Sequence, residues 1–181
     1  GDVSRMNKMG AVKDWDRLMF LIYLQLSFEV NARTSEAWGE VRAKSPKSDE
    51  EFVKVIKATR AWRQASDLKD WKSKDYIESF KVPDEVIRRV RKHDGKETSI
   101  EEIKDVVFRQ LIDNWEYSYN DMASQISDGE VINIPELNKK ITSSPKRFLR
   151  FWERRFNYAG RKSIRKLAKL YGLWKDREDT T

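Results

Sequence analysis

Apolar residues recur every three or four positions along most of the chain, which is the spacing of an amphipathic α-helix. No stretch alternates polar and apolar residues over several turns of chain, as a half-buried strand would. The seven glycines and four prolines are about half the usual share of these turn-forming residues. The pattern therefore predicts an all-α multi-helix bundle and argues against a β-sandwich or a barrel.

The first predicted helix, residues 14–32, is apolar around nearly its whole circumference, so we expect it to be the buried spine of the bundle. Thr34 or Ser35 can cap a short second helix that ends at Lys44-Ser45-Pro46. The same spacing predicts further helices over residues 48–62, 67–80, 83–95, 99–127, 135–141, 145–159 and 162–171.

Local signals mark the ends of several of these helices. Ser48 with Glu51, and Ser99 with Glu102, form two capping boxes, in which a hydroxyl and a carboxylate three residues apart satisfy the first backbone amides. Helix starts are also predicted at Pro83 and Pro145, and helix ends at Gly95, at Ser127-Asp128-Gly129 and at Ala159-Gly160.

Residues 130–134 are the one short stretch with extended character, so the fold is expected to contain at most one short strand or hairpin. The polar, glycine-containing segment 92–96 lies about midway along the chain. It predicts an N-terminal helical bundle over residues 1–95 and a basic C-terminal helical region over residues 96–181. Packing of both halves as one domain is the alternative.

The composition removes most catalytic chemistries. The chain has no cysteine, which excludes disulfides, thiolate nucleophiles and most structural zinc sites. Its one histidine, His93, stands in Arg-Lys-His-Asp-Gly, where a cation at a helix end is the simpler interpretation than a functional imidazole. No glycine-rich phosphate loop or His-Glu-x-x-His motif is present. We expect a protein that is not an enzyme, with no catalytic residue, metal or cofactor.

The longest apolar segment, residues 18–30, is too short to span a bilayer, which takes about 20 residues. No small-residue cleavage site follows the basic N-terminal residues, so a signal peptide is not predicted. These observations favour a soluble protein without membrane contact, in the reducing interior of the cell. We expect the cytoplasm, with the nucleus as the alternative.

Basic charge is concentrated near the C-terminus. The whole chain carries a formal charge of +7, yet residues 139–177 hold 14 basic and 2 acidic side chains. Residues 1–138 hold 23 basic and 26 acidic side chains, mixed as on an ordinary soluble surface. The segment 139–177 is therefore the candidate site of interaction with an anionic partner.

Arg147, Arg150 and Arg154 share one face of the helix predicted from Pro145, because their spacings are three and four residues. Guanidinium groups bind phosphate in a bidentate manner, so this acid-poor face is a candidate nucleic-acid contact. The alternatives are a solvated face or a contact with an acidic protein. The complete candidate set for nucleic-acid binding is Lys146, Arg147, Arg150, Arg154, Arg161, Lys162, Arg165, Lys166, Lys169, Trp152 and Tyr158.

Aromatic residues are interleaved with these basic residues. Phe148, Phe151, Trp152 and Phe156 follow helical spacing, and burial in the core explains such a stripe more simply than a stacking platform does. Exposed rings would suit stacking on unpaired bases, so their exposure bears on the choice between single strands and duplexes. A second basic cluster, Arg88 to Lys92, lies in the last turns of a helix, where the macrodipole already accounts for cations.

The region before and after Pro145 resembles a helix-turn-helix. When Ile134 is taken as the first position of the motif, Leu137, Ile141, Phe148 and Phe151 occupy its four apolar positions. The sequence departs from the motif at Asn138, where a small residue is usual, and at Thr142, where the turn glycine is usual. The resemblance implies that the second helix of the pair enters the major groove.

Taken together, the sequence predicts a helical domain or accessory subunit that binds nucleic acid, DNA or RNA, and works with other protein subunits. A replication or primase assembly, a nucleic-acid-guided effector and a viral nucleoprotein are the settings that size, helicity and charge suggest. The alternative is a protein–protein scaffold whose basic face docks an acidic partner.

Overall fold

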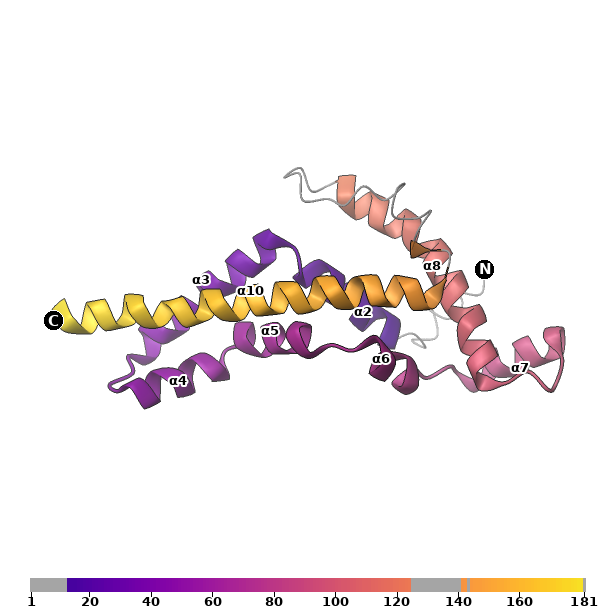
Figure 1. Cartoon of the computed structure of the whole chain (residues 1–181), viewed down its shortest axis with the longest axis horizontal. Helices are drawn as coiled ribbons and strands as arrows, with labels where there is room; N and C mark the ends of the chain where they lie inside the picture. The colour runs from indigo at the N-terminus through magenta and orange to yellow at the C-terminus, as the bar shows by residue number, and fades with distance from the viewer. Residues whose placement is uncertain (1–12, 125–140, 143, 181) are drawn as a thin grey trace. The chain divides into compact units, whose positions relative to one another are not determined.

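The computed structural model describes residues 13–124, 141–142 and 144–180. In these ranges the chain forms eight helices and no strand, so the all-α prediction is confirmed (Figure 1). The helices are α2 (Lys13–Leu24), α3 (Ser27–Lys44), α4 (Asp49–Ala58), α5 (Arg60–Asp70), α6 (Ser73–Ser79), α7 (Asp84–Asp94), α8 (Ile100–Ser124) and α10 (Pro145–Thr180).

The chain forms two compact units, each assembled from segments that are far apart in the sequence. The first unit contains Gly1–Leu18 and Ser73–Phe151, and the second contains Met19–Lys72 and Trp152–Thr181. Helices α2 and α10 each contribute residues to both units. The predicted division into residues 1–95 and 96–181 stays a prediction.

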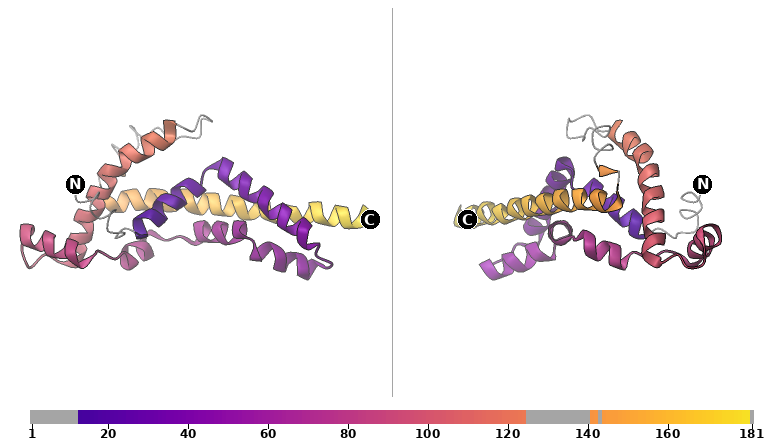
Figure 2. Two further views of the ribbon diagram at one scale, coloured as in Figure 1. Left: turned by 180° about the vertical axis from the view of Figure 1, so that it is seen from behind. Right: turned by 45° about the vertical axis from the view of Figure 1, so that its right-hand side comes forward.

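The second unit is built around the C-terminal part of α10, which runs along α3, α4 and α5 (Figures 1 and 2). Side chains from all four helices form one apolar core. Partly buried rings such as Trp38 and Trp62 pack against this core. The core residues are Ala37, Val41, Phe52, Ile56, Ala61, Ala65, Leu167, Leu170 and Trp174.

The helix predicted over residues 14–32 is two helices. α2 ends at Leu24, and Leu26 has extended backbone, with ψ 140°, before α3 begins. The Tyr23 hydroxyl donates a hydrogen bond to the Glu29 carboxylate across this break. Leu24, Gln25 and Leu26 are all buried, so the apolar pattern continues through the break and hides it.

The predicted helix start at Thr34 or Ser35 is also wrong, because both residues lie inside α3. The Thr34 hydroxyl donates to the Val30 carbonyl at 2.8 Å, the i−4 bond by which threonine is accommodated within a helix. The predicted end is confirmed: Ser45 adopts the left-handed conformation, with φ 44°, after Lys44.

Thr59, the one polar residue in a predicted apolar stripe, separates α4 from α5. Its hydroxyl donates to the Ile56 carbonyl at 2.6 Å and accepts from the Trp62 amide at 3.1 Å, so one side chain serves both helix ends. Ser48 caps α4 as predicted, since its hydroxyl accepts from the Glu51 amide at 3.1 Å. The helix predicted over residues 48–62 is therefore divided at a buried cap.

Gly160 does not stop a helix, contrary to the prediction, because α10 continues through it to Thr180. A methyl group on Gly160 would lie 2.7 Å from the Ala65 carbonyl oxygen and from the Lys69 Cα atom. The backbones of α10 and α5 thus approach closely at this point, and only glycine fits. The predicted helix from residue 162 is the continuation of α10.

The first unit has its own aromatic core. Tyr76 and Phe80 pack with Phe108 of α8, and the Tyr76 hydroxyl donates to the Asp14 carbonyl at 2.8 Å. Burial raises the pKa of Tyr76 well above that of an exposed phenol, so this hydroxyl stays a donor. Trp115 meets Phe148 edge to face, with ring centroids 5.1 Å apart.

The helix start at Ser99 and the helix end at Gly95 are both confirmed. The Ser99 hydroxyl accepts from the Glu102 amide at 3.2 Å, and Gly95 has φ 117°, a conformation that favours glycine. The predicted strand 130–134, the stop at residues 127–129 and most of the helix 135–141 lie outside the described residues. So do Ile134, Leu137 and Asn138 of the helix-turn-helix resemblance.

Candidate nucleic-acid interface

One side of α10 is buried along its length, which fixes the orientation of the other side. Phe148, Trp152, Phe156 and Leu167 are each no more than 1% exposed. Of the predicted core stripe, Phe148, Trp152 and Phe156 are buried, and Phe151 is partly buried. Trp152, which the sequence also offered as a stacking platform, is removed from the candidate interface because its ring has no solvent-exposed surface.

Asn157 fastens α10 to the end of α5. Its side-chain amide donates to the Leu68 and Trp71 carbonyl oxygens, both at 3.0 Å. The last carbonyls of a helix have no partner within the helix, so an amide donor placed there acts as a cap from a distant part of the chain. Together with the close approach at Gly160, this contact holds α10 firmly in the second unit.

The opposite side of α10 carries a row of exposed residues at spacings of four, three, four and four. We call this row the basic face. Tyr158, 58% exposed, is its aromatic member and lies between arginines. The basic face consists of Arg154, Tyr158, Arg161, Arg165 and Lys169, all of them exposed.

Two further candidates lie at the edge of this row. Lys162 and Lys166 are partly buried, and the Lys166 ammonium donates to the Asn31 side-chain oxygen at 2.6 Å. Because Asn31 belongs to α3, the edge of the basic face that contains Lys166 lies beside α3.

Lys146, Arg147 and Arg150 are exposed in the part of α10 that belongs to the first unit. The helix begins there as predicted, with the Ser144 hydroxyl accepting from the Arg147 amide at 3.2 Å. Arg147 and Arg150 continue the three- and four-residue spacing of the basic face toward the start of the helix.

The cations of the basic face have no acidic partner in the ranges that the structure describes. Among the described residues, no carboxylate lies within ion-pair distance of Arg154, Arg161 or Arg165. Elsewhere the same residue type is paired: Arg60 contacts Glu36 at 3.0 Å, and the hydrogen bond from Arg60 lowers the pKa of Glu36. Within the described part of the chain, the basic face therefore presents uncompensated positive charge.

The second basic cluster, on α7, differs in this respect. Arg89 lies 3.7 Å from Glu85, and Arg91 donates to the Thr98 carbonyl at 3.2 Å. Both residues are in the second half of α7, near its negative dipole end. These contacts favour a structural role for this cluster.

The described part of the chain contains no group of three or more histidine and acidic residues that could hold a metal ion. The His93 ring is 90% exposed, and its Nδ1 atom lies 2.8 Å from Asp94. Within the described ranges, no helix is long and apolar enough to cross a membrane.

The basic face can act as a binding surface. Guanidinium groups on a fixed helix present forked donors suited to phosphate oxygens, and an exposed phenol ring offers a flat surface to a base. Comparison with known proteins gives no match: no family model, curated protein or solved structure matches the chain.

Proposed function

We propose that this protein is a non-catalytic nucleic-acid-binding domain, an accessory part of a larger nucleoprotein assembly within the cell, and that the basic face is its contact surface. The observation that carries the proposal is the row Arg154, Arg161 and Arg165, exposed on a firmly anchored helix without acidic partners among the described residues. A surface meant only for solubility would mix charges of both signs.

The dimensions of the row suit a polyanion. From Arg154 to Lys169 the helix advances about 22 Å at 1.5 Å per residue. That length corresponds to about six nucleotides at the 3.4 Å rise of one strand. Several phosphates can therefore be contacted at once, and each contact adds to affinity by releasing condensed counterions.

Tyr158 favours single strands over duplexes as the ligand. Its exposed ring stands between Arg154 and Arg161, so a base can stack on the phenol while neighbouring phosphates meet guanidinium groups. Duplex DNA keeps its bases stacked inside and offers only phosphates to such a row.

The test is binding to a fluorescent single-stranded oligonucleotide of mixed sequence over a salt series. We expect affinity to fall steeply with salt, and the Arg154→Ala, Arg161→Ala, Arg165→Ala variant to lower the slope magnitude by about 0.7 per lost phosphate contact. Tyr158→Ala should weaken single-strand binding about tenfold, whereas Tyr158→Phe keeps the ring and the affinity.

A matched control removes the same charge elsewhere. The Arg88→Ala, Arg89→Ala, Arg91→Ala variant alters the α7 cluster and should change the slope less. Binding by the basic-face variant that equals the parent's would refute the proposed surface. If the parent itself shows no salt-dependent binding to any oligonucleotide, the alternative of a scaffold that docks an acidic protein replaces this proposal.

A further inference from the structure

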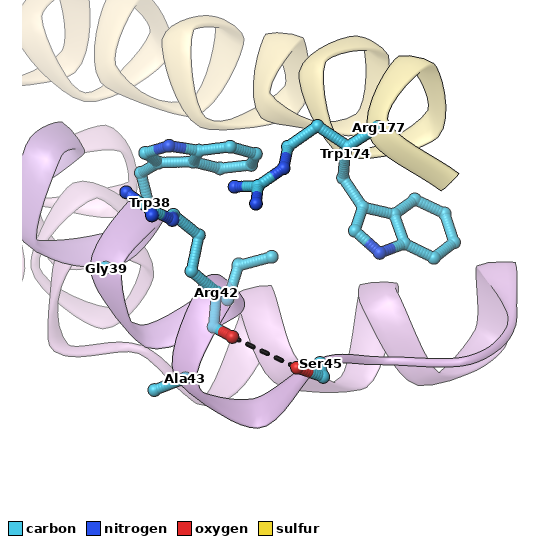
Figure 3. A pocket seen from close by; sticks show the side chains of 8 residues that line it. Trp38, Gly39, Arg42, Ala43, Ser45, Trp174 and Arg177 are labelled. Atoms are coloured by element: carbon cyan, nitrogen blue, oxygen red, sulfur yellow. Dashed lines mark hydrogen bonds between the residues drawn. The ribbon is translucent and has the colours of Figure 1, made fainter. Parts of the chain in front are cut away.

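A pocket of about 470 Å³ lies in the second unit, where the end of α3 meets the last turns of α10 (Figure 3). Trp38 and Arg42 line it from α3, and Trp174 and Arg177 line it from α10. Its volume falls within the range of small-ligand sites, about 300 to 1,000 Å³. No part of the basic face lines this pocket.

The walls of the pocket combine aromatic and cationic side chains. Two side chains are aromatic and two are arginine, and none of the described residues that line the pocket is acidic. Figure 3 shows Arg42 and Arg177, one from each helix, reaching toward the Trp38 indole. A ligand that combines a flat ring with an anionic group would match both kinds of wall, by stacking on an indole and by binding guanidinium forks.

The aromatic walls are held in place by the core. Trp38 is partly buried against the apolar cluster that contains Val41 and Trp174. Trp174 stacks on Phe52, with ring centroids 5.1 Å apart and planes inclined by 25°. The pocket therefore needs little rearrangement before it can accept a ring, which lowers the entropic cost of binding.

The pocket lies on the side of α10 that faces α3, and the edge of the basic face lies beside the same helix. Lys162, Lys166 and Arg177 are separated by four and eleven residues, close to whole turns of the helix, so they share the side of α10 that faces α3. The hydrogen bond from Lys166 to Asn31 places that side next to the helix that carries Trp38 and Arg42. A strand that contacts Lys162 and Lys166 at the edge of the basic face would therefore run beside α3, the helix that carries Trp38 and Arg42 of the pocket.

We propose that this pocket binds one nucleotide, with the base against Trp38 and the phosphate between Arg42 and Arg177. The nucleotide can be free or an unpaired unit of a bound single strand, and the latter case rests on the function proposed above. A pocket for one flipped-out nucleotide would give this protein a preference for strands with unpaired bases.

Gly39 provides a clean way to fill the pocket. It lines the pocket within α3, and a Cβ atom added there meets nothing within 4 Å. Gly172, on α10, has equally open surroundings and does not line the pocket. Leucine at either position should preserve the fold, because both glycines are inside helices and leucine is the better helix former.

The first experiment is calorimetric titration of the whole chain with AMP, ribose 5-phosphate and adenosine. We expect AMP to bind at least tenfold more tightly than either fragment, since only AMP supplies both base and phosphate. Gly39→Leu, and the double variant Arg42→Ala, Arg177→Ala, should each weaken AMP binding about tenfold or more. Gly172→Leu should bind AMP as the parent does.

The second experiment separates the two sources of the nucleotide. An oligonucleotide with one abasic position should bind more weakly than the intact strand if the pocket takes a unit of the strand, and equally if the pocket serves free nucleotides. In both cases the Arg154→Ala, Arg161→Ala, Arg165→Ala variant should keep its affinity for AMP. The pocket and the basic face can thus fail independently.

Three results would overturn the pocket proposal: AMP affinity that is the same in Gly39→Leu as in Gly172→Leu, binding of ribose 5-phosphate as tight as that of AMP, or no AMP binding at millimolar concentration. An acidic peptide that binds in place of nucleotides, with the same dependence on Arg42 and Arg177, would also overturn it and would identify a protein partner.

Discussion

Two glycines of α10 have opposite surroundings. Gly160 lies against the α5 backbone, and Gly172 faces open space. The same residue type therefore has a packing role at one position and none at the other. Its cost to helix stability, about 0.5 to 1 kcal/mol relative to alanine, applies at both positions and is offset only at Gly160.

We expect Gly160→Ala to lower the free energy of unfolding by about 1 to 3 kcal/mol, because the added methyl must push apart two backbones. Gly172→Ala should raise it by about 0.5 to 1 kcal/mol. Urea denaturation of both variants measures the difference. Equal effects at the two positions would show that α10 and α5 are not in close contact.

Glu36 connects pH to stability. Hydrogen bonds from the Arg60 and Arg33 guanidinium groups hold the pKa of the Glu36 carboxyl below its ordinary value. A depressed carboxyl pKa gives stability that is present above the unfolded-state pKa and is lost as pH falls through the folded-state pKa.

Replacing Glu36 by glutamine should therefore lower stability at neutral pH and flatten its fall on acidification. Because the side chain is 41% exposed, the loss should be below about 1 kcal/mol and should shrink in high salt. Unfolding measured from neutral pH to about pH 3 tests this interpretation. A variant as acid-sensitive as the parent would mean that other carboxyls dominate.

At the scale of elements, the helix starts marked by a capping box are predictable from the sequence. Ser48 and Ser99 accept hydrogen bonds from the amides three residues on, as their spacing to Glu51 and Glu102 indicates. Such signals are local, so they can be recognised without knowledge of tertiary packing. The break after Leu24 and the continuation through Gly160 depend on contacts with other helices, which periodicity does not reveal.

The candidate interface likewise has a part that local sequence signals predict and a part that depends on tertiary contacts. Exposure of Arg154 follows from helical periodicity, because the apolar stripe fixes the buried side of the helix predicted from Pro145. The continuation of the row through Arg161 and Arg165 was not predicted, because the sequence placed a helix end at Gly160. Asn157 was not predicted as an anchor, since its acceptors belong to a helix from a distant part of the sequence. Trp38 and Arg177 line one pocket although they are far apart in the sequence, so this pocket could not be predicted either.

The second half of α2 should contribute strongly to stability. Leu21 and Ile22 are 4% and 1% exposed, so replacing either by alanine should cost about 2 to 5 kcal/mol. Phe20, on the same helix, is 47% exposed and provides the control: Phe20→Ala should have a much smaller effect. If the two core variants melt like the parent, α2 is peripheral to the fold.

At the scale of the whole molecule, the segments that form each unit come from both halves of the sequence. The second unit takes Met19–Lys72 from the N-terminal half and Trp152–Thr181 from the C-terminal half. Its core is incomplete without α10, which supplies Leu167, Leu170 and Trp174. The segment with most of the net positive charge is thus also structural.

A fragment of residues 1–95 should therefore lack a fixed core. We expect it to show helical far-ultraviolet circular dichroism without a cooperative thermal transition, because Phe52 and Ile56 would lose the α10 side of their packing. The full chain should unfold cooperatively under the same conditions. A sharp transition in the fragment would show that the N-terminal half folds alone.

The two sides of α10 also imply two evolutionary regimes within one helix. On the buried side, Gly160 and Trp152 leave little room for change in side-chain volume. On the basic face, arginine and lysine can replace one another, or shift by a helical turn, without loss of the fold. Among descendants of this sequence, we expect side-chain volume to be conserved on the buried side of α10. On the basic face, we expect only the positive charge to be conserved, so that affinity for the ligand can change while the fold persists.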